Sequence, residues 1–188
     1  MIERYTNPEM GNIWSDQAKY QTWLDVEIAA CEANCKLGKI PQSAMETIRT
    51  KARFKPERIL EIEEEVRHDV IAFLTNVNEY VGDAGRYIHV GMTSSDVLDT
   101  GLALQLKSSV KLLRKELLFL EEAIRDLASQ HKKTVMIGRS HAIHGEPITF
   151  GFKLAGWLAE TLRNKDRLNS LEKDISVGQI SGAMGTYA

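Results

Sequence analysis

Side chains that bind anions or transfer protons gather at a few points along the chain. They occur in four short stretches: Arg4-Tyr5, Arg67-His68-Asp69, residues 86–96 and residues 138–146. Arginine presents a planar set of donors that fits a carboxylate or a phosphate. Histidine has an ordinary pKa of about 6.5, so it can donate or accept a proton at neutral pH. Where such stretches are loops on a rigid scaffold, they are candidates for a binding or catalytic site.

Arg67-His68-Asp69 has two interpretations. In the first, it is only a turn between helices, in which Asp69 caps the following helix and Arg67 stays in solvent. In the second, Arg67 and His68 reach a phosphate or carboxylate group of a ligand. The residue types alone allow both interpretations.

Thr93-Ser94-Ser95-Asp96 is typical of a helix start, because hydroxyl and aspartate side chains cap helix N-termini. The free N–H groups of such a terminus also bind anions, so the same residues are candidates for holding a ligand. Asp96 and Asp99 lie seven residues before Ala103 and Leu106, which begin two rows of apolar residues repeated every seven positions. Acids at these positions either favour the helix dipole or line a polar cavity, and both alternatives stay open.

The stretch from Ser140 to Glu146 places His141 and His144 close to a carboxylate. A metal site is one alternative, although zinc would need a further ligand from another loop. The other alternative gives one histidine a structural role and the other a proton-transfer role near Arg139. We favour the second alternative and expect no metal.

The rest of the sequence predicts helices almost throughout. Apolar residues recur at steps of three or four, and prolines stand at breaks in that periodicity. No stretch shows sustained period-two alternation, so we expect no sheet. Four amino-terminal helices are expected. The first covers residues 15–37, and the second starts at a capping box formed by Ser43 and Glu46. The third starts at Pro56, and the fourth starts at a cap on Asp69.

A heptad repeat predicts one long helix. Apolar rows that begin at Ala103 and Leu106 continue at intervals of seven to Ile124 and Leu127. A helix over residues 95–130 would be ~54 Å long, whereas a compact globule of this chain length is roughly 40 Å across. We therefore expect an elongated bundle in which partner chains cover the apolar seam.

The stretches on either side of that helix matter for any site. Residues 82–94 precede it and residues 131–146 follow it. They would lie at opposite ends of the helix, so they could build one small-molecule site only across subunits. A second long helix is expected to begin at Pro147.

The expected fold class is all-α. A short-helix amino-terminal domain over residues 1–93 precedes a long-helix bundle domain over residues 94–188. Residues 176–188 are rich in glycine and show no clear stop. We therefore expect the bundle domain to be incomplete in this chain.

Composition excludes some classes of partner. The chain has 188 residues, with 24 basic and 26 acidic side chains and a formal charge of −2. That balance argues against nucleic-acid binding. No apolar run approaches the roughly 20 residues that cross a bilayer, and residues 1–5 lack the features of a secretory signal. Cys31 and Cys35 form no disulfide framework and fit a reducing compartment, so we expect a cytoplasmic protein without membrane partners.

Taken in order, these motifs resemble the adenylosuccinate lyase family of the fumarase/aspartase superfamily. The resemblance covers the whole chain and rests on Arg4-Tyr5, Arg67-His68-Asp69, Val90-Gly91-Met92-Thr93-Ser94-Ser95-Asp96, Gly138-Arg139-Ser140-His141 with Glu146-Pro147, and residues 178–188. The related 3-carboxymuconate cycloisomerases are the nearest alternative. A non-catalytic helical oligomerisation module and a metal-binding bundle are alternatives of other classes.

The resemblance implies a homotetramer with shared active sites and no metal or organic cofactor. It also implies a lyase of purine biosynthesis that releases fumarate from adenylosuccinate, giving AMP, and from succinyl-aminoimidazole-carboxamide ribotide. Such an elimination needs a base for a carbon-bound proton, stabilisation of a dianionic carboxylate, and an acid for the departing nitrogen.

Residue roles follow from the same resemblance. His141 would be the catalytic acid, His68 would orient the substrate in the catalytic centre, and Thr93 with Ser94 would hold the succinyl carboxylate. The other substrate-binding candidates are Arg4, Tyr5, Arg67 and Asp69 for the nucleotide, His89 for the phosphate or a neighbouring loop, and Ser140, where the family often has threonine. The general base, a serine in a Ser-Ser-x-Met-Pro-x-Lys-x-Asn loop, would lie beyond residue 188. The 188-residue chain alone is therefore expected to be inactive.

Overall fold

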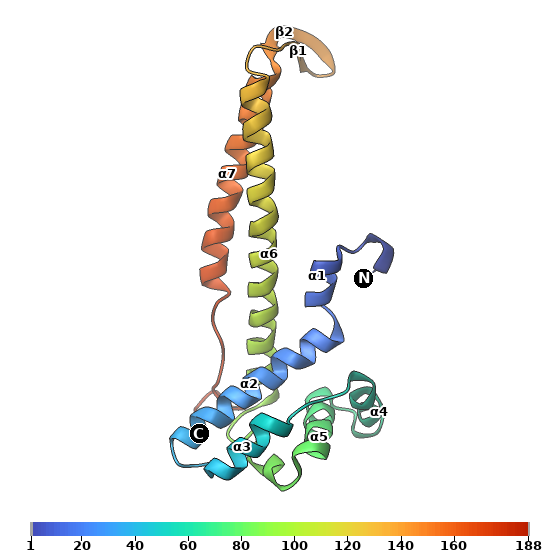
Figure 1. The fold of residues 1–188 in the computed structure, drawn as a ribbon, viewed down its shortest axis with the longest axis vertical. Helices are drawn as coiled ribbons and strands as arrows, with labels where there is room; N and C mark the ends of the chain where they lie inside the picture. The colour runs from blue at the N-terminus through green and yellow to red at the C-terminus, as the bar shows by residue number, and fades with distance from the viewer. Residues whose placement is uncertain (1, 188) are drawn as a thin grey trace. The chain divides into compact units, whose positions relative to one another are not determined.

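The computed structural model describes residues 2–187, and these residues are mostly helical (Figure 1). They form two compact units. The first unit contains residues up to 108 together with the stretch after 175, and the second contains residues 109–175. The elements of the first unit are η1 (Glu3–Tyr5), α1 (Pro8–Ile13), α2 (Asp16–Lys36), α3 (Gln42–Lys51), α4 (Pro56–Val66), α5 (Asp69–Val81) and η2 (Gly82–Tyr87). Helix α6 (Ser94–Gln130) begins in the first unit and ends in the second, which also holds β1 (Val135–Ser140), β2 (Ile143–Thr149) and α7 (Phe150–Asp174).

The core of the first unit is an aromatic cluster between α2 and α5. The rings of Tyr20 and Phe73 stack with centroids 6.0 Å apart, and Trp23 meets Phe73 edge-on at 5.5 Å. These three side chains are at most 3% exposed. Such geometries add to the free energy gained by burying the rings. The predicted helix over 15–37 is confirmed, with Ser15 as its N-cap and Leu37 as its C-cap.

Two of the expected helix starts need correction. Helix α3 begins at Gln42 with Pro41 as its N-cap, so the capping box expected at Ser43 is wrong. Helix α5 is capped by His68 rather than by Asp69. The imidazole Nδ1 of His68 accepts the Ile71 N–H at 3.4 Å. The expected start at Pro56 is confirmed.

Helix α6 is 37 residues long, as the heptad repeat predicts. Its first turns pack closely on α2 in the first unit. A Cβ added at Gly101 would lie only 2.8 Å from Trp23 Cδ1 and 3.0 Å from Thr22 Oγ1. The stretch before α6 contains the 3-10 helix η2.

The second unit contains an antiparallel β-hairpin, so the expectation of no sheet is wrong. Strands β1 and β2 pair from Val135 with Thr149 to Ser140 with Ile143. His141 and Ala142 form the two-residue connection, and their φ angles of 52° and 60° are both positive, as type I′ turns require. Pairing in so short a ribbon is decided by this turn rather than by an alternating pattern.

The start of α7 also differs from the prediction. Pro147 lies in β2 opposite Ile137, and α7 begins at Phe150 with the Thr149 hydroxyl accepting the Phe152 N–H at 3.1 Å. Both strands of a two-stranded ribbon are edges, where a proline without an N–H is tolerated.

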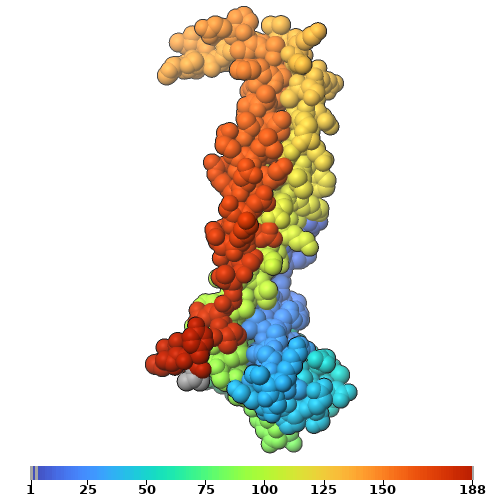
Figure 2. Space-filling model, turned by 90° about the vertical axis from the view of Figure 1, so that its left-hand side faces the viewer, coloured from blue at the N-terminus to red at the C-terminus, as the bar shows by residue number. Residues whose placement is uncertain are grey.

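Helix α7 lies along the second part of α6 (Figure 1, Figure 2). Val110 and Ile124 of α6 and Leu154 of α7 are buried. Lys165 of α7 donates to the buried Glu121 carboxylate of α6 at 2.6 Å. Part of the predicted apolar rows of α6 stays exposed, however, including Leu113, Leu120 and Leu127, and so do Leu162 and Leu171 of α7. Within residues 2–187, no helix is long and apolar enough to span a membrane.

Candidate functional site

The start of α6 is organised around one buried carboxylate. Asp96 is 0% exposed. Its Oδ2 accepts the N–H of Thr93 at 3.0 Å and of Gly182 at 3.1 Å, and its Oδ1 accepts the N–H of Ser181 at 3.0 Å. Burial acts to raise the pKa of Asp96, but the backbone donors of Ser181, Thr93 and Gly182 outweigh it and hold that pKa below its usual value. Of the two alternatives for Asp96, a place in the first turn of α6 is confirmed.

A second residue of α6 holds the same glycine-rich stretch. The Thr100 hydroxyl donates to the Gln179 carbonyl at 3.1 Å and accepts the Gln179 N–H at 3.0 Å. Residues 178–182 are therefore fastened to α6 at two points, one turn apart. Thr93 and Ser94 lie beside this stretch with partly exposed side chains, so their hydroxyls can contact a ligand.

His89 is held by Glu27, an acid that belongs to none of the motifs described above. Glu27 of α2 is 1% exposed, and its Oε1 lies 2.5 Å from His89 Nδ1. The backbone N–H of His89 donates to Glu27 Oε2 at 3.0 Å. A signal existed in the sequence, because Glu27 lies on the apolar stripe between Leu24 and Cys31.

Arg67-His68-Asp69 forms the corner between α4 and α5. Arg67 ends α4 with φ of 55°, and it lines a groove of about 480 Å³ together with Leu60, Glu63 and Glu64. His68 Nδ1 lies 3.4 Å from Asp69 Oδ1. The interpretation of this motif as a turn is thus confirmed, with His68 as the cap, and the half-exposed side chains remain accessible to a ligand.

The remaining candidates are exposed. The Arg4 guanidinium lies 4.8 Å from the centroid of the Tyr5 ring, which is 74% exposed. Ser140 and His141 are exposed on the hairpin of the second unit. Among the side chains that the structure describes, no group of three or more His, Cys, Asp or Glu residues could hold a metal ion.

Backbone conformation singles out several of these candidates. Among the described non-glycine residues, positive φ occurs at Arg67, His89, His141, Ala142 and Tyr187. Such conformations are uncommon for residues with a Cβ, and they cluster at functional sites. Three of the five positions, Arg67, His89 and His141, are site candidates of the sequence analysis.

Hydrogen bonds bring one candidate of the first unit together with the glycine-rich stretch. Thr93 is joined to Ser181 and Gly182 through Asp96. The other candidates of the first unit are Arg4, Tyr5, Arg67, His68, Asp69, His89 and Ser94, whereas Ser140 and His141 belong to the second unit.

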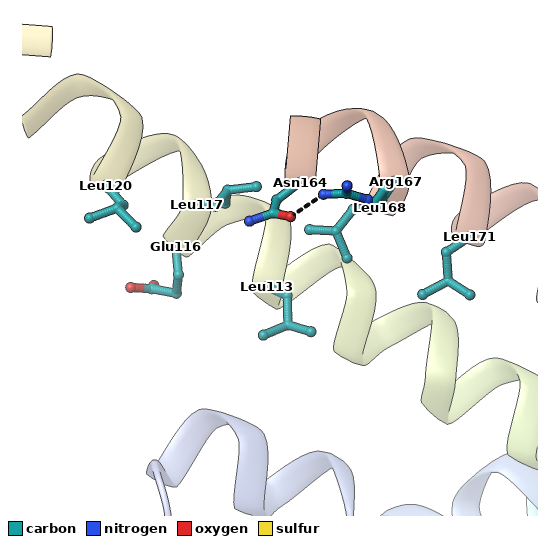
Figure 3. A pocket seen from close by; sticks show the side chains of 8 residues that line it. All are labelled: Leu113, Glu116, Leu117, Leu120, Asn164, Arg167, Leu168 and Leu171. Atoms are coloured by element: carbon teal, nitrogen blue, oxygen red, sulfur yellow. Dashed lines mark hydrogen bonds between the residues drawn. The ribbon is translucent and has the colours of Figure 1, made fainter. Parts of the chain in front are cut away.

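An apolar groove runs between α6 and α7 of the second unit (Figure 3). Its volume is about 650 Å³. Leu113, Leu117 and Leu120 line it from α6, and Leu168 with Leu171 line it from α7. Arg167 donates to the Asn164 side chain at 2.7 Å beside it.

The fold is that of the fumarate lyase superfamily. A fumarate lyase from a Mesorhizobium species matches with a TM-score of 0.89 and 31% identity, over 96% of this chain and 44% of that chain. A 3-carboxy-cis,cis-muconate lactonizing enzyme from Pseudomonas putida matches with a TM-score of 0.91 and 33% identity, over 98% and 44%. The sequence model of the lyase family matches residues 3–188, and the chain belongs to that family.

Curated relatives agree with the resemblance drawn from the motifs. The chain is 70% identical over 188 residues to an adenylosuccinate lyase from a Synechocystis species and 49% identical to that of Bacillus subtilis. Each alignment covers all of this chain and 44% of the relative. The chain thus spans less than half the length of these relatives.

Proposed function

We propose that this chain forms part of an enzyme that eliminates fumarate from adenylosuccinate to give AMP. The same enzyme would act on succinyl-aminoimidazole-carboxamide ribotide, in the same purine pathway. The observation that carries the proposal is 70% identity over the full chain to an adenylosuccinate lyase. The positive φ angles at Arg67, His89 and His141 support the choice of site.

The proposed chemistry divides the candidates into two groups. His141 protonates the departing nitrogen, and Thr93 with Ser94 hold the succinyl carboxylate at the start of α6. Arg4, Tyr5, Arg67 and Asp69 bind the nucleotide, His68 orients it, and His89 and Ser140 add contacts to it. No metal or organic cofactor takes part in this scheme, and the general base is supplied from outside these 188 residues.

The scheme requires a pocket shared between copies of the chain. His141 is exposed on its hairpin, whereas an acid works best in a site that excludes bulk water. The 37-residue helix α6 separates Thr93 from His141 along the chain. We therefore propose a homotetramer in which α6 and α7 pack against partner helices through the apolar groove of the second unit.

Several further features belong to the same proposal. The protein acts in the cytoplasm, without nucleic-acid or membrane partners. Residues 1–93 and 94–188 belong to two domains, and the second corresponds to part of a longer domain in relatives of which this chain covers 44%. The 188-residue chain alone has no lyase activity, because it lacks the base.

One alternative is favoured by a specific observation. The structural likeness to a muconate lactonizing enzyme is as close as that to a fumarate lyase, with TM-scores of 0.91 and 0.89. Muconate lactonization and the proposed elimination both act on substrates with several carboxylates, but only the proposed elimination releases AMP. Supplying the full-length protein with adenylosuccinate and, separately, with 3-carboxymuconate distinguishes the two. Release of fumarate and AMP supports the proposal, and turnover of the muconate alone contradicts it.

A complementation assay tests the shared site and excludes a non-catalytic module. The wild-type 188-residue chain is assembled with a full-length protein that carries His141→Gln. Recovery of fumarate release would show that the short chain supplies its own His141 to a site completed by the other polypeptide. A mixed assembly that is confirmed by mass and stays inactive would contradict the proposal. A short chain that carries the same substitution is the control.

A further inference from the structure

The buried acid at the start of α6 links two stretches that are far apart in the sequence. Asp96 Oδ2 accepts both the Thr93 N–H at 3.0 Å and the Gly182 N–H at 3.1 Å. Because the same oxygen accepts both N–H groups, a shift of residues 181–182 would move the Asp96 carboxylate and, with it, the backbone of Thr93. Bonds to an ionised acceptor are shorter and stronger than neutral ones, so this coupling is stiff.

The Asp96 carboxylate can influence Thr93 through the backbone N–H of that residue. It is fully buried and receives N–H groups on both oxygens, whereas the side chains of Thr93 and Ser94 are partly exposed beside it. The hydroxyls thus remain available to a ligand while the backbone beneath them is fixed. A misplacement of about 1 Å in such a group can cost about a hundredfold in rate.

We propose that Asp96 is a positioning residue, which sets the place of Thr93 and Ser94 in the succinyl-carboxylate site and couples that site to residues 178–182. This inference rests on the proposed function. Asp96 itself makes no contact with the substrate. Its effect is therefore confined to the part of the ligand that Thr93 and Ser94 hold.

Thr100 provides a matched control. It fastens the same glycine-rich stretch through both hydrogen bonds to Gln179, but neither of these bonds involves Thr93. If Asp96 only anchors residues 178–182, Thr100→Val and Asp96→Asn should have equal effects. If Asp96 positions Thr93, only Asp96→Asn should weaken the carboxylate site.

The test uses the full-length protein and its two products as inhibitors. We expect Asp96→Asn to raise the inhibition constant of fumarate by about tenfold or more and to leave that of AMP unchanged. In Thr100→Val, Ser181 and Gly182 keep their bonds to Asp96, so both constants should stay unchanged. A general loss of structure lowers the amount of active enzyme but changes neither constant. An unchanged fumarate constant in Asp96→Asn, or an equal rise in Thr100→Val, overturns the inference.

Two further measurements keep the test decisive. If Asp96→Asn does not fold, Asp96→Glu replaces it, since it keeps the charge but displaces both acceptor oxygens. Amide hydrogen exchange at Thr93 then reads the coupling without any catalysis, and it should accelerate in the Asp96 variants but not in Thr100→Val. A wild-type protein that releases no fumarate overturns the proposed function. Unchanged exchange at Thr93 overturns the coupling itself.

Discussion

His89 Nδ1 lies 2.5 Å from Oε1 of Glu27, an acid of α2 that is 1% exposed. The other oxygen of Glu27 accepts the backbone N–H of His89 at 3.0 Å. His89 has φ of 67°, a conformation that residues with a Cβ rarely adopt. One buried carboxylate therefore holds both the ring and the backbone of a strained residue.

Replacing Glu27 should destabilise the first unit. Glu27→Leu keeps a similar volume but leaves the donors of His89 without their acceptor, which costs about 1–3 kcal/mol. Glu32→Leu on the same helix is the matched control, because the Glu32 ion pair with Arg49 is exposed and such pairs contribute at most about 1 kcal/mol. Unfolding in urea measures both variants. Equal losses of stability would contradict a special role for Glu27.

The stability conferred by Asp96 should depend on pH. Because the folded pKa of Asp96 lies below the unfolded value of about 3.9, its carboxylate stabilises the fold fully above that value. The stabilisation is lost as the pH falls through the folded pKa. The difference in unfolding free energy between wild type and Asp96→Asn should thus be constant near neutral pH and shrink in acid. Thr100→Val introduces no change of charge, so a similar shrinkage in that variant would contradict the assignment.

The two cysteines should differ in reactivity. Burial, with a smaller contribution from the nearby Glu27, raises the pKa of the Cys31 thiol to about 12. The thiolate is the reactive form, so Cys31 should resist alkylation by iodoacetamide at neutral pH. Cys35 is only partly buried and should react first. Peptide mass mapping after brief labelling measures both sites, and modification of native Cys31 before Cys35 would refute this prediction.

Two glycines of α7 should respond to alanine in opposite directions. A Cβ at Gly151 would lie 2.6 Å from the Ala128 carbonyl oxygen, whereas a Cβ at Gly156 would have no atom within 4 Å. Gly151→Ala should therefore cost about 1–3 kcal/mol. Gly156→Ala should stabilise the helix by about 0.5–1 kcal/mol, because alanine loses less backbone entropy. Thermal unfolding of the two variants distinguishes them, and a stable Gly151→Ala protein would mean that α7 does not approach α6 so closely.

Local patterns in the sequence were enough to predict the long helices. The apolar spacing along α2 and the heptads of α6 both repeat within one or two helical turns. Each pattern can therefore be recognised in a short stretch of sequence. The β-hairpin was not visible in this way. Its turn residues, His141 and Ala142, lack the Asn-Gly or Asp-Gly signal, and its strands are too short to show alternation.

The site was predicted by residue type but not by geometry. Hydroxyls, arginines and histidines at helix boundaries indicated the candidates, yet their supporting acids depend on contacts between distant parts of the chain. Glu27 meets His89 across 62 residues, and Asp96 meets Gly182 across 86. Periodicity carries no information about such pairs. An acid within an apolar stripe, as at Glu27, is the one local signal that would have indicated a buried partner.

The most direct test of the proposed function replaces the acid on the hairpin. In the full-length protein, His141→Gln should lower the rate of fumarate release from adenylosuccinate by about 10²- to 10⁴-fold, with little change in substrate affinity. His144→Gln, on the same exposed hairpin, is the matched control and should retain activity. A loss of less than about tenfold in His141→Gln, below the usual range for such a group, would contradict the central claim.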